Sequence, residues 1–190
     1  MTPASVPVAS KGILQIVFAV FLLSLTAQCH KAPANEYVLF DFENDSELDC
    51  LHWNCRALYA LANEHATHGL RSLRLELYPS DYPGFKPILK KNDWRGYKRL
   101  CFDIYNPQGY SVRTAIRIDD SKEASDYYDR YNKGLALLPG MNHISIPLDS
   151  LAASGKARSL NLGTICNFLI FTLHPKEKVV LYVDYVRLTA

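Results

Sequence analysis

Charged and aromatic side chains recur at a two-residue spacing in two stretches of the sequence and continue into the loop that follows. The candidates are Asp103, Tyr105, Arg117, Asp119, Tyr128, Arg130 and Tyr131. Aromatic faces stack on the apolar faces of sugar rings, and planar polar groups hydrogen-bond to sugar hydroxyls. The set is therefore suited to non-covalent binding of a sugar. The alternative is an ordinary ion pair between Arg117 and Asp119, with tyrosines that only cover a loop.

Catalysis has weaker support in the sequence. Asp103 and Asp119 would be the acid and base of a glycosidase, but nothing distinguishes them from the polar face of a sheet. The chain has no nucleophile-elbow sequence, no phosphate-binding loop and no helical His-Glu metal motif. We therefore predict a protein that is not an enzyme.

Short apolar alternations, separated by Gly, Pro, Asn and Asp, must position these side chains. The clearest is 112–119, where Val112, Thr114 and Ile116 alternate with charged or small residues. The other expected strands are 38–43, 56–62, 73–78, 100–105, 131–138, 142–148, 165–173 and 179–188. A helix is the alternative for 56–62, and 150–160 is expected to form a helical turn. With no long helix, this pattern predicts an all-β fold, an antiparallel β-sandwich.

Turn sequences predict which strands are neighbours. Asn106-Pro107-Gln108-Gly109 is typical of a hairpin turn, which would make 100–105 and 112–119 neighbouring strands. Asp103 and Tyr105 are then expected near Arg117 and Asp119 on the polar side of these strands. Pro139-Gly140 is expected to join 131–138 and 142–148 as a pair. The first and last strands are also expected to pair, as they often do in sandwiches.

The N-terminus has the pattern of an export signal. Lys11 precedes an apolar run, 13–25, which is short for a membrane span of about 20 residues. We expect a signal peptide or membrane anchor over 1–28, a tether over 29–36 and one domain over 37–190. Cys29 stands where a bacterial lipoprotein is lipidated; cleavage near Ala27 and retention as an anchor are the alternatives.

Composition narrows the possible partners. The 190 residues carry a formal net charge of +2, with Lys and Arg scattered along the chain. No basic stripe marks a nucleic-acid site, so we predict no nucleic-acid partner and a membrane contact only through the leader or a lipid.

Two of the five cysteines flank a short loop segment. Cys50 and Cys55 would form a disulfide in an exported protein, whereas a zinc site with His52 would lack a fourth ligand. Cys101 and Cys166 lie in expected strands and are predicted to be small buried or half-buried side chains.

An ordered set of motifs carries a family resemblance. The motifs are Asp41-Phe42-Glu43, His65-Ala66-Thr67-His68-Gly69-Leu70-Arg71-Ser72-Leu73, Trp94-Arg95-Gly96-Tyr97, Leu137-Leu138-Pro139-Gly140, Ile144-Ser145-Ile146-Pro147-Leu148 and Leu181-Tyr182-Val183-Asp184. Over 37–190 the chain resembles carbohydrate-binding modules of the galactose-binding-like jelly-roll superfamily. The resemblance implies a jelly roll that binds a saccharide or polysaccharide in an exported bacterial protein, periplasmic, at the cell surface or membrane-anchored. The alternative is a structural module of the cell envelope whose partner is an envelope protein.

The resemblance also implies a structural calcium ion where the first strand, the turn near Gly69 and the last strand meet. Its ligands would be Asp41, Glu43, Ser72 and Asp184. Calcium takes six to eight oxygen ligands, which these side chains and nearby carbonyls would supply. The alternative is that the carboxylates are solvated or pair with Arg71 and Arg187.

Overall fold

The computed structural model describes Met1 and residues 35–52, 55–122 and 126–190. Strands dominate it, with three short 3-10 helices. The strands are β1 (Glu36–Phe40), β2 (Leu51–His52), β3 (Ala57–Ala62), β4 (Ser72–Leu77), β5 (Gly84–Pro87), β6 (Arg99–Asn106), β7 (Val112–Asp119), β8 (Tyr131–Leu137), β9 (Gly140–Pro147), β10 (Asn167–Thr172) and β11 (Val179–Thr189). The 3-10 helices are η1 (Asp45–Cys50), η2 (Tyr127–Asp129) and η3 (Leu148–Ser150).

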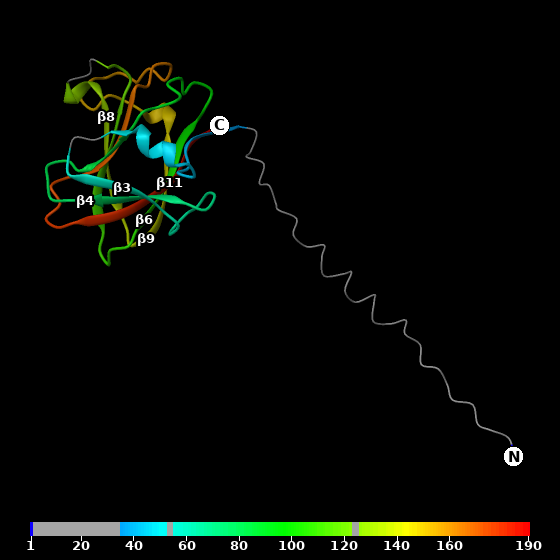
Figure 1. Cartoon of the computed structure of the whole chain (residues 1–190). Helices are drawn as coiled ribbons and strands as arrows, with labels where there is room; N and C mark the ends of the chain where they lie inside the picture. The colour runs from blue at the N-terminus through cyan, green and yellow to red at the C-terminus, as the bar shows by residue number, and fades with distance from the viewer. Residues whose placement is uncertain (2–34, 53–54, 123–125) are drawn as a thin grey trace. The chain divides into compact units, whose positions relative to one another are not determined.

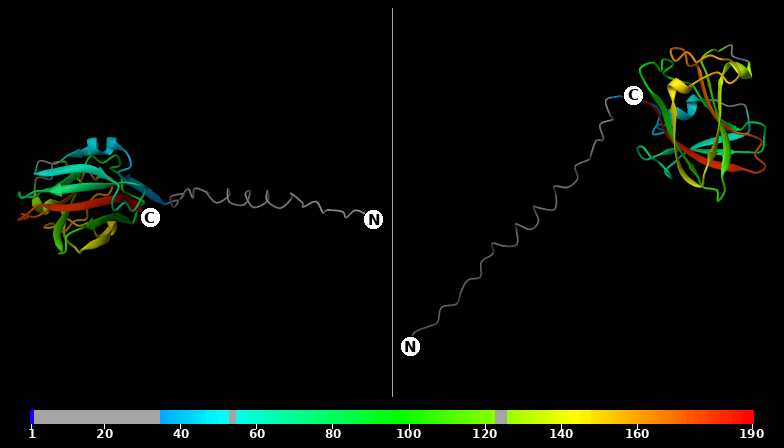
Figure 2. Two further views of the ribbon diagram at one scale, coloured as in Figure 1. Left: turned by 60° about the horizontal axis from the view of Figure 1, so that its bottom comes forward. Right: turned by 180° about the vertical axis from the view of Figure 1, so that it is seen from behind.

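The strands form two antiparallel sheets that pack face to face (Figures 1 and 2). The six-stranded sheet has the order β3-β4-β11-β6-β9, with β1 paired to β11, and the five-stranded sheet has the order β2-β5-β10-β7-β8. The predicted antiparallel β-sandwich is therefore confirmed. Residues 57–62 form a strand and not the helix that was the alternative.

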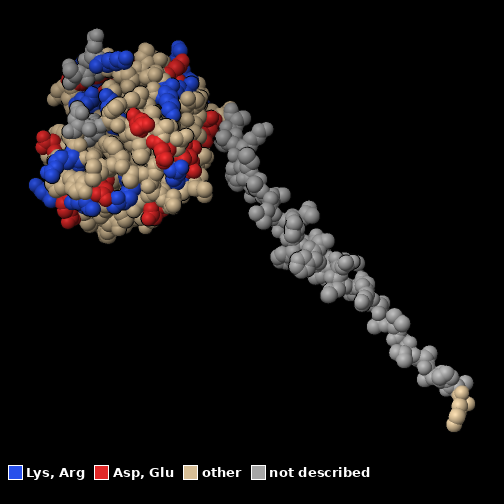
Figure 3. All heavy atoms as spheres, in the orientation of Figure 1, with Lys and Arg blue, Asp and Glu red and all other residues tan. Residues whose placement is uncertain are grey.

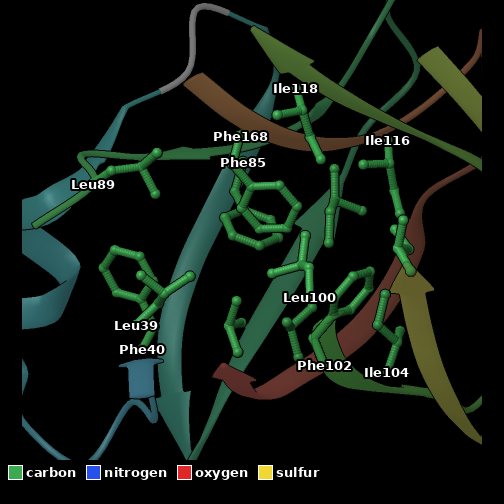
Figure 4. Packing of buried hydrophobic residues seen from close by; sticks show 14 of the residues in the cluster. Leu39, Phe40, Phe85, Leu89, Leu100, Phe102, Ile104, Ile116, Ile118 and Phe168 are labelled. Atoms are coloured by element: carbon green, nitrogen blue, oxygen red, sulfur yellow. The ribbon is translucent and has the colours of Figure 1, made fainter. Parts of the chain in front are cut away.

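Large aromatic and aliphatic side chains fill the space between the sheets (Figure 4). Phe168 of β10 contacts Phe85 of β5 edge-on at 6.3 Å and Phe102 of β6 at 5.9 Å, measured between ring centroids. Ile116 and Ile118 of β7 have no exposed surface. Because side chains alternate along a strand, the residues between them face outward.

The two ends of the domain lie side by side, as the sequence predicts. β1 pairs with the second half of β11, and the Ala190 amide donates to the Asn35 carbonyl at 3.0 Å. The C-terminus lies next to the start of the domain in Figure 1.

Both predicted hairpins are wrong. The turn at 106–109 connects β6 to β7, which belong to different sheets, and Pro139-Gly140 carries the chain from β8 to β9, again in different sheets. A turn signal marks where a strand ends but not where the next strand pairs. In a sandwich, many connections cross from one layer to the other.

The predicted first strand ends early. β1 stops at Phe40, and Phe42 reaches the core with a φ of 56°, in the left-handed region. The regular strand therefore ends before Asp41 and Glu43, and the predicted strand over 38–43 is longer than the observed one.

The predicted leader, Cys29 and most of the tether lie outside the described residues, as does Trp53. Among the residues that the structure describes, no helix is both long and apolar enough to cross a membrane. Acidic and basic side chains are interspersed on the face drawn in Figure 3.

Candidate functional site

A groove with a cavity volume of about 420 Å³ lies on the outer face of the five-stranded sheet. Its floor comes from β7, β8 and β10: Ala115, Arg117, Asn132, Gly134, Leu169 and Phe171. Its rim comes from loops and the edge of the sheet: Tyr82, Tyr127, Arg130, Lys133 and Leu173. The groove thus combines aromatic faces with planar polar groups.

Strand register builds the floor. Ala115 lies between Gly134 of β8 and Phe171 of β10, and Arg117 lies between Asn132 and Leu169 in the same way. A Cβ atom added at Gly134 would have no neighbour within 4 Å, so the floor is open at this point. The residue directly beside Phe171 on the floor is thus the small Ala115.

Tyrosines stand on the rim. Tyr82 packs edge-on against Phe171, with 5.8 Å between ring centroids, and Tyr127 lies beneath the guanidinium of Arg130 at 5.2 Å. The exposed fractions of Tyr82 and Tyr127 are 45% and 53%, so both remain accessible to a ligand.

An ion pair fixes the arginine on the floor. The Nε and Nη2 atoms of Arg117 donate to Asp119 at 2.8 and 2.7 Å, and the side chain of Asn167 donates to the same carboxylate at 2.9 Å. Asp119 itself has no exposed surface. A bidentate pair of this kind holds the guanidinium in one orientation.

A second network holds the rim. Arg158 donates to both oxygens of Asp120, at 2.7 and 2.9 Å, and to Asp129 at 2.7 Å. Arg158 holds the pKa of both carboxyl groups below the usual range. The network ties Asp120, which directly follows β7, and Asp129, which directly precedes Arg130, to Arg158.

Only part of the predicted ligand-binding set meets at the groove. Arg117 and Arg130 line it, and Asp119 lies beneath Arg117. Tyr128 does not line it; its ring packs against Gly155, where an added Cβ would lie 2.2 Å from Cδ1. Tyr131 is a core residue, 8% exposed and paired with Ile118, so its prediction as a ligand contact is corrected.

Asp103 and Tyr105 lie on the other sheet, so the expectation that they neighbour Arg117 and Asp119 is wrong. Asp103 is buried and accepts a hydrogen bond from Thr67 Oγ1 at 2.7 Å. Tyr105 stacks on the ring of His65, which lies in the same loop as Thr67. Asp103 and Arg117 are separated because the chain crosses between the sheets at 106–109. For the same reason Asp103 and Asp119 do not face each other as the acid and base of a glycosidase.

The sequence analysis missed several residues of the groove. Phe171 and Leu169 belong to a strand that it predicted, and the outward positions of that strand were a usable signal. Tyr82 lies in a loop rich in Pro, Gly and Tyr, and no sequence pattern there indicates that its side chain lines the groove.

The predicted calcium ligands cluster around the loop 65–72, but backbone amides occupy their oxygens. Asp184 Oδ2 accepts from the amides of Thr67 and His68 at 2.6 and 2.9 Å. Glu43 Oε1 accepts from the amides of Leu70 and Arg71 at 2.8 and 2.6 Å. These amides satisfy one oxygen of each carboxylate with two hydrogen bonds.

The other two predicted ligands are also engaged. Ser72 Oγ donates to the Glu64 carbonyl at 2.6 Å, and Asp41 lies 3.4 Å from Nδ1 of His68. In the part of the chain that is described, no group of three or more His, Cys, Asp or Glu side chains is arranged to hold a metal ion. This arrangement does not fit the six to eight oxygens of a calcium shell.

We therefore expect the melting temperature to be the same in millimolar calcium and in excess chelator, because the amides already satisfy the carboxylates. Differential scanning calorimetry of the full chain measures it. An ion that binds only the folded state raises the melting temperature, so an increase in calcium would show that the site rearranges to bind it.

The described cysteines, Cys50, Cys55, Cys101 and Cys166, are free thiols. Cys101 is buried, as predicted, and Cys166 is half-buried. The disulfide between Cys50 and Cys55 is not present, and residues 53–54 between them lie outside the described part.

A scan against protein-family models gives no match, and a search of curated proteins gives none either. Solved structures do match. The family 11 carbohydrate-binding module from Clostridium thermocellum, solved in complex with a β-1,3-1,4-mixed-linked tetrasaccharide, has a TM-score of 0.61 and 16% identity, over 84% of this chain and 98% of that one.

Larger proteins contain the same fold. An exo-β-agarase matches with a TM-score of 0.63 and 18% identity, over 80% of this chain but only 25% of the agarase chain. The Clostridium thermocellum xylanase 10B (CBM22-1 and GH10 modules), complexed with xylohexaose, matches with a TM-score of 0.54 and 12% identity, over 83% of this chain and 29% of that one. Residues 35–190 therefore have the jelly-roll fold of carbohydrate-binding modules.

Proposed function

We propose that this domain binds a saccharide in the groove on the outer face of the five-stranded sheet, without transforming it. The observation that carries the proposal is the meeting of Tyr82, Phe171 and Tyr127 with the guanidinium groups of Arg117 and Arg130 in one groove. Stacking on the aromatic faces and hydrogen bonds from planar groups are what sugar recognition needs.

The rigidity of the floor supports the same role. Three adjacent strands carry it, and the ion pair between Arg117 and Asp119 fixes its main polar group. A preformed site loses little conformational entropy when a ligand binds. The similar fold of the family 11 module, solved with a tetrasaccharide, also supports the proposal.

Export and attachment to the bacterial envelope remain predictions of the sequence, and they fit a protein that meets polysaccharides outside the cell. The rival role is an envelope-protein module that does not bind sugar. The groove favours saccharide binding, because its aromatic rim is open and spaced along a strand-built floor.

We expect Tyr82→Ala and Tyr127→Ala each to weaken glycan binding about tenfold, which corresponds to about 1.4 kcal/mol. Each change removes one stacking surface, either the ring beside Phe171 or the ring beneath Arg130. Affinity gel electrophoresis against a panel of soluble polysaccharides identifies the ligand, and isothermal titration calorimetry measures the dissociation constants.

The matched control is Tyr110→Ala. Tyr110 is 46% exposed and hydrogen-bonds to Glu177, but it does not line the groove. Equal losses in all three variants would argue against the groove as the site. No retardation of the wild type by any glycan, with an envelope protein bound instead, would favour the rival role.

A further inference from the structure

The charges around the groove are unbalanced. Arg117, Arg130 and Lys133 line it, whereas no Asp or Glu does. The carboxylate that pairs with Arg117, Asp119, is fully buried and also accepts a hydrogen bond from Asn167. The surface offered to a ligand is therefore cationic.

Arg130 has a buried hydrogen-bond donor without an acceptor among the residues that the structure describes. This donor is its Nε atom. No ion pair joins Arg130 or Lys133 to a carboxylate in the described part of the chain, and the Arg130 guanidinium lies over the ring of Tyr127, 5.2 Å from its centroid. Burial, with the nearby charge of Arg117, lowers the pKa of Arg130.

A buried donor without an acceptor costs free energy, and so does a desolvated cation without a counter-charge. Both costs are removed by one kind of ligand group, a planar or tetrahedral oxyanion that accepts several N–H bonds from a guanidinium. Neutral sugars satisfy this site less well. Their hydroxyls also donate hydrogen bonds, and the lining has no carboxylate to accept them.

We propose that the groove selects acidic saccharides, in which a carboxylate or sulfate group binds Arg130 while the sugar ring stacks on the aromatic rim. This inference rests on the proposed function and narrows it to a ligand class. Carboxylate and sulfate share the chemistry that the guanidinium recognises, so the experiment must separate the two sources.

The test measures dissociation constants of the full chain for four probes: polygalacturonate as the carboxylate, a sulfated carrageenan as the sulfate, and mixed-linkage β-glucan and agarose as neutral glycans. At least one acidic probe is expected to bind ten times more tightly than both neutral ones. Raising the salt concentration from about 0.05 to 0.5 M is expected to weaken the binding of the acidic probe alone, because salt screens the interaction between charges.

The diagnostic variant is Arg130→Ala. It is expected to lose at least tenfold in affinity for the acidic probe and less than twofold for a neutral glycan. Because the Arg130 Nε is buried without an acceptor and the guanidinium forms no ion pair among the described residues, the variant is also expected to melt at the same temperature as the wild type or higher, which a merely structural arginine would not show. Arg130→Lys retains the charge but lacks the planar guanidinium group, and it is expected to recover part of the affinity.

Arg56→Ala is the matched control, since it removes the same charge from an exposed position before β3, on the other sheet. Tight binding of a neutral glycan that is unaffected by Arg130→Ala would overturn this inference and leave the proposed function standing. No binding of any probe would overturn both. Preference for polygalacturonate or for carrageenan would support the inference and identify the acidic group.

Discussion

The Asp184→Ala variant is expected to lose about 4 kcal/mol of unfolding free energy. The Asp184 carboxylate is 1% exposed and accepts the backbone amides of Thr67, His68 and Tyr185 at 2.6, 2.9 and 2.6 Å. Alanine leaves all of these donors without an acceptor, and each buried unsatisfied donor costs about 1–3 kcal/mol. Urea denaturation at neutral pH measures the loss.

Asp184→Asn tests the cause. Burial raises the pKa of Asp184, and the amides of His68 and Thr67 oppose this shift, so the fold needs the acceptor oxygen more than the charge. The amide side chain retains one acceptor, and we expect a loss of about half that of alanine. Asp149→Ala, at an exposed carboxylate, is the control and should change stability by less than about 0.5 kcal/mol. Equal effects of all three substitutions would contradict the assigned role.

The Arg158→Met variant is expected to lose about 2 kcal/mol at pH 7. It leaves the Asp120 side chain, only 5% exposed, without its bidentate partner. Removing one partner of a buried ion pair costs about 3–5 kcal/mol, and the partial exposure of Arg158 reduces this figure. Methionine preserves the aliphatic packing, so the loss reports the ion pair.

The stability lost in Arg158→Met is expected to depend on pH. Arg158 lowers the pKa of Asp120 in the folded state below its ordinary value of 3.8, so the unfolded state binds more protons. The stabilisation is therefore fully present above that ordinary value and is lost as the pH falls through the lower folded-state pKa. The difference between wild type and variant should be constant from pH 7 to about pH 5 and shrink below about pH 4. A difference that persists at low pH would show that the loss comes from packing. Arg56→Met is the control and should leave stability unchanged at every pH.

Local sequence determined the longer strands because side-chain alternation is a property of each segment alone, whereas the short strands β2 and β5 were not predicted. The residues 112–119 show this: Ile116 and Ile118 are buried, Arg117 faces out, and the pattern required no knowledge of the neighbours. The same reasoning identified Arg117, Asp119 and Arg130 as members of one polar region, since they are close in sequence or lie on adjoining segments.

Apart from the pairing of the first and last strands, only the tertiary structure decided which strands are neighbours. Pairing depends on the packing of whole layers and not on the turn between two segments. The turn at 106–109 is typical of a hairpin, yet it crosses between the sheets and takes Asp103 and Tyr105 away from the groove. The same packing brings Tyr82 and Phe171 to Arg117 from distant parts of the chain. The sequence by itself determined an exposed polar strand in a β-sandwich, and the assembly of two layers decided that this strand forms the floor of a cationic, aromatic groove.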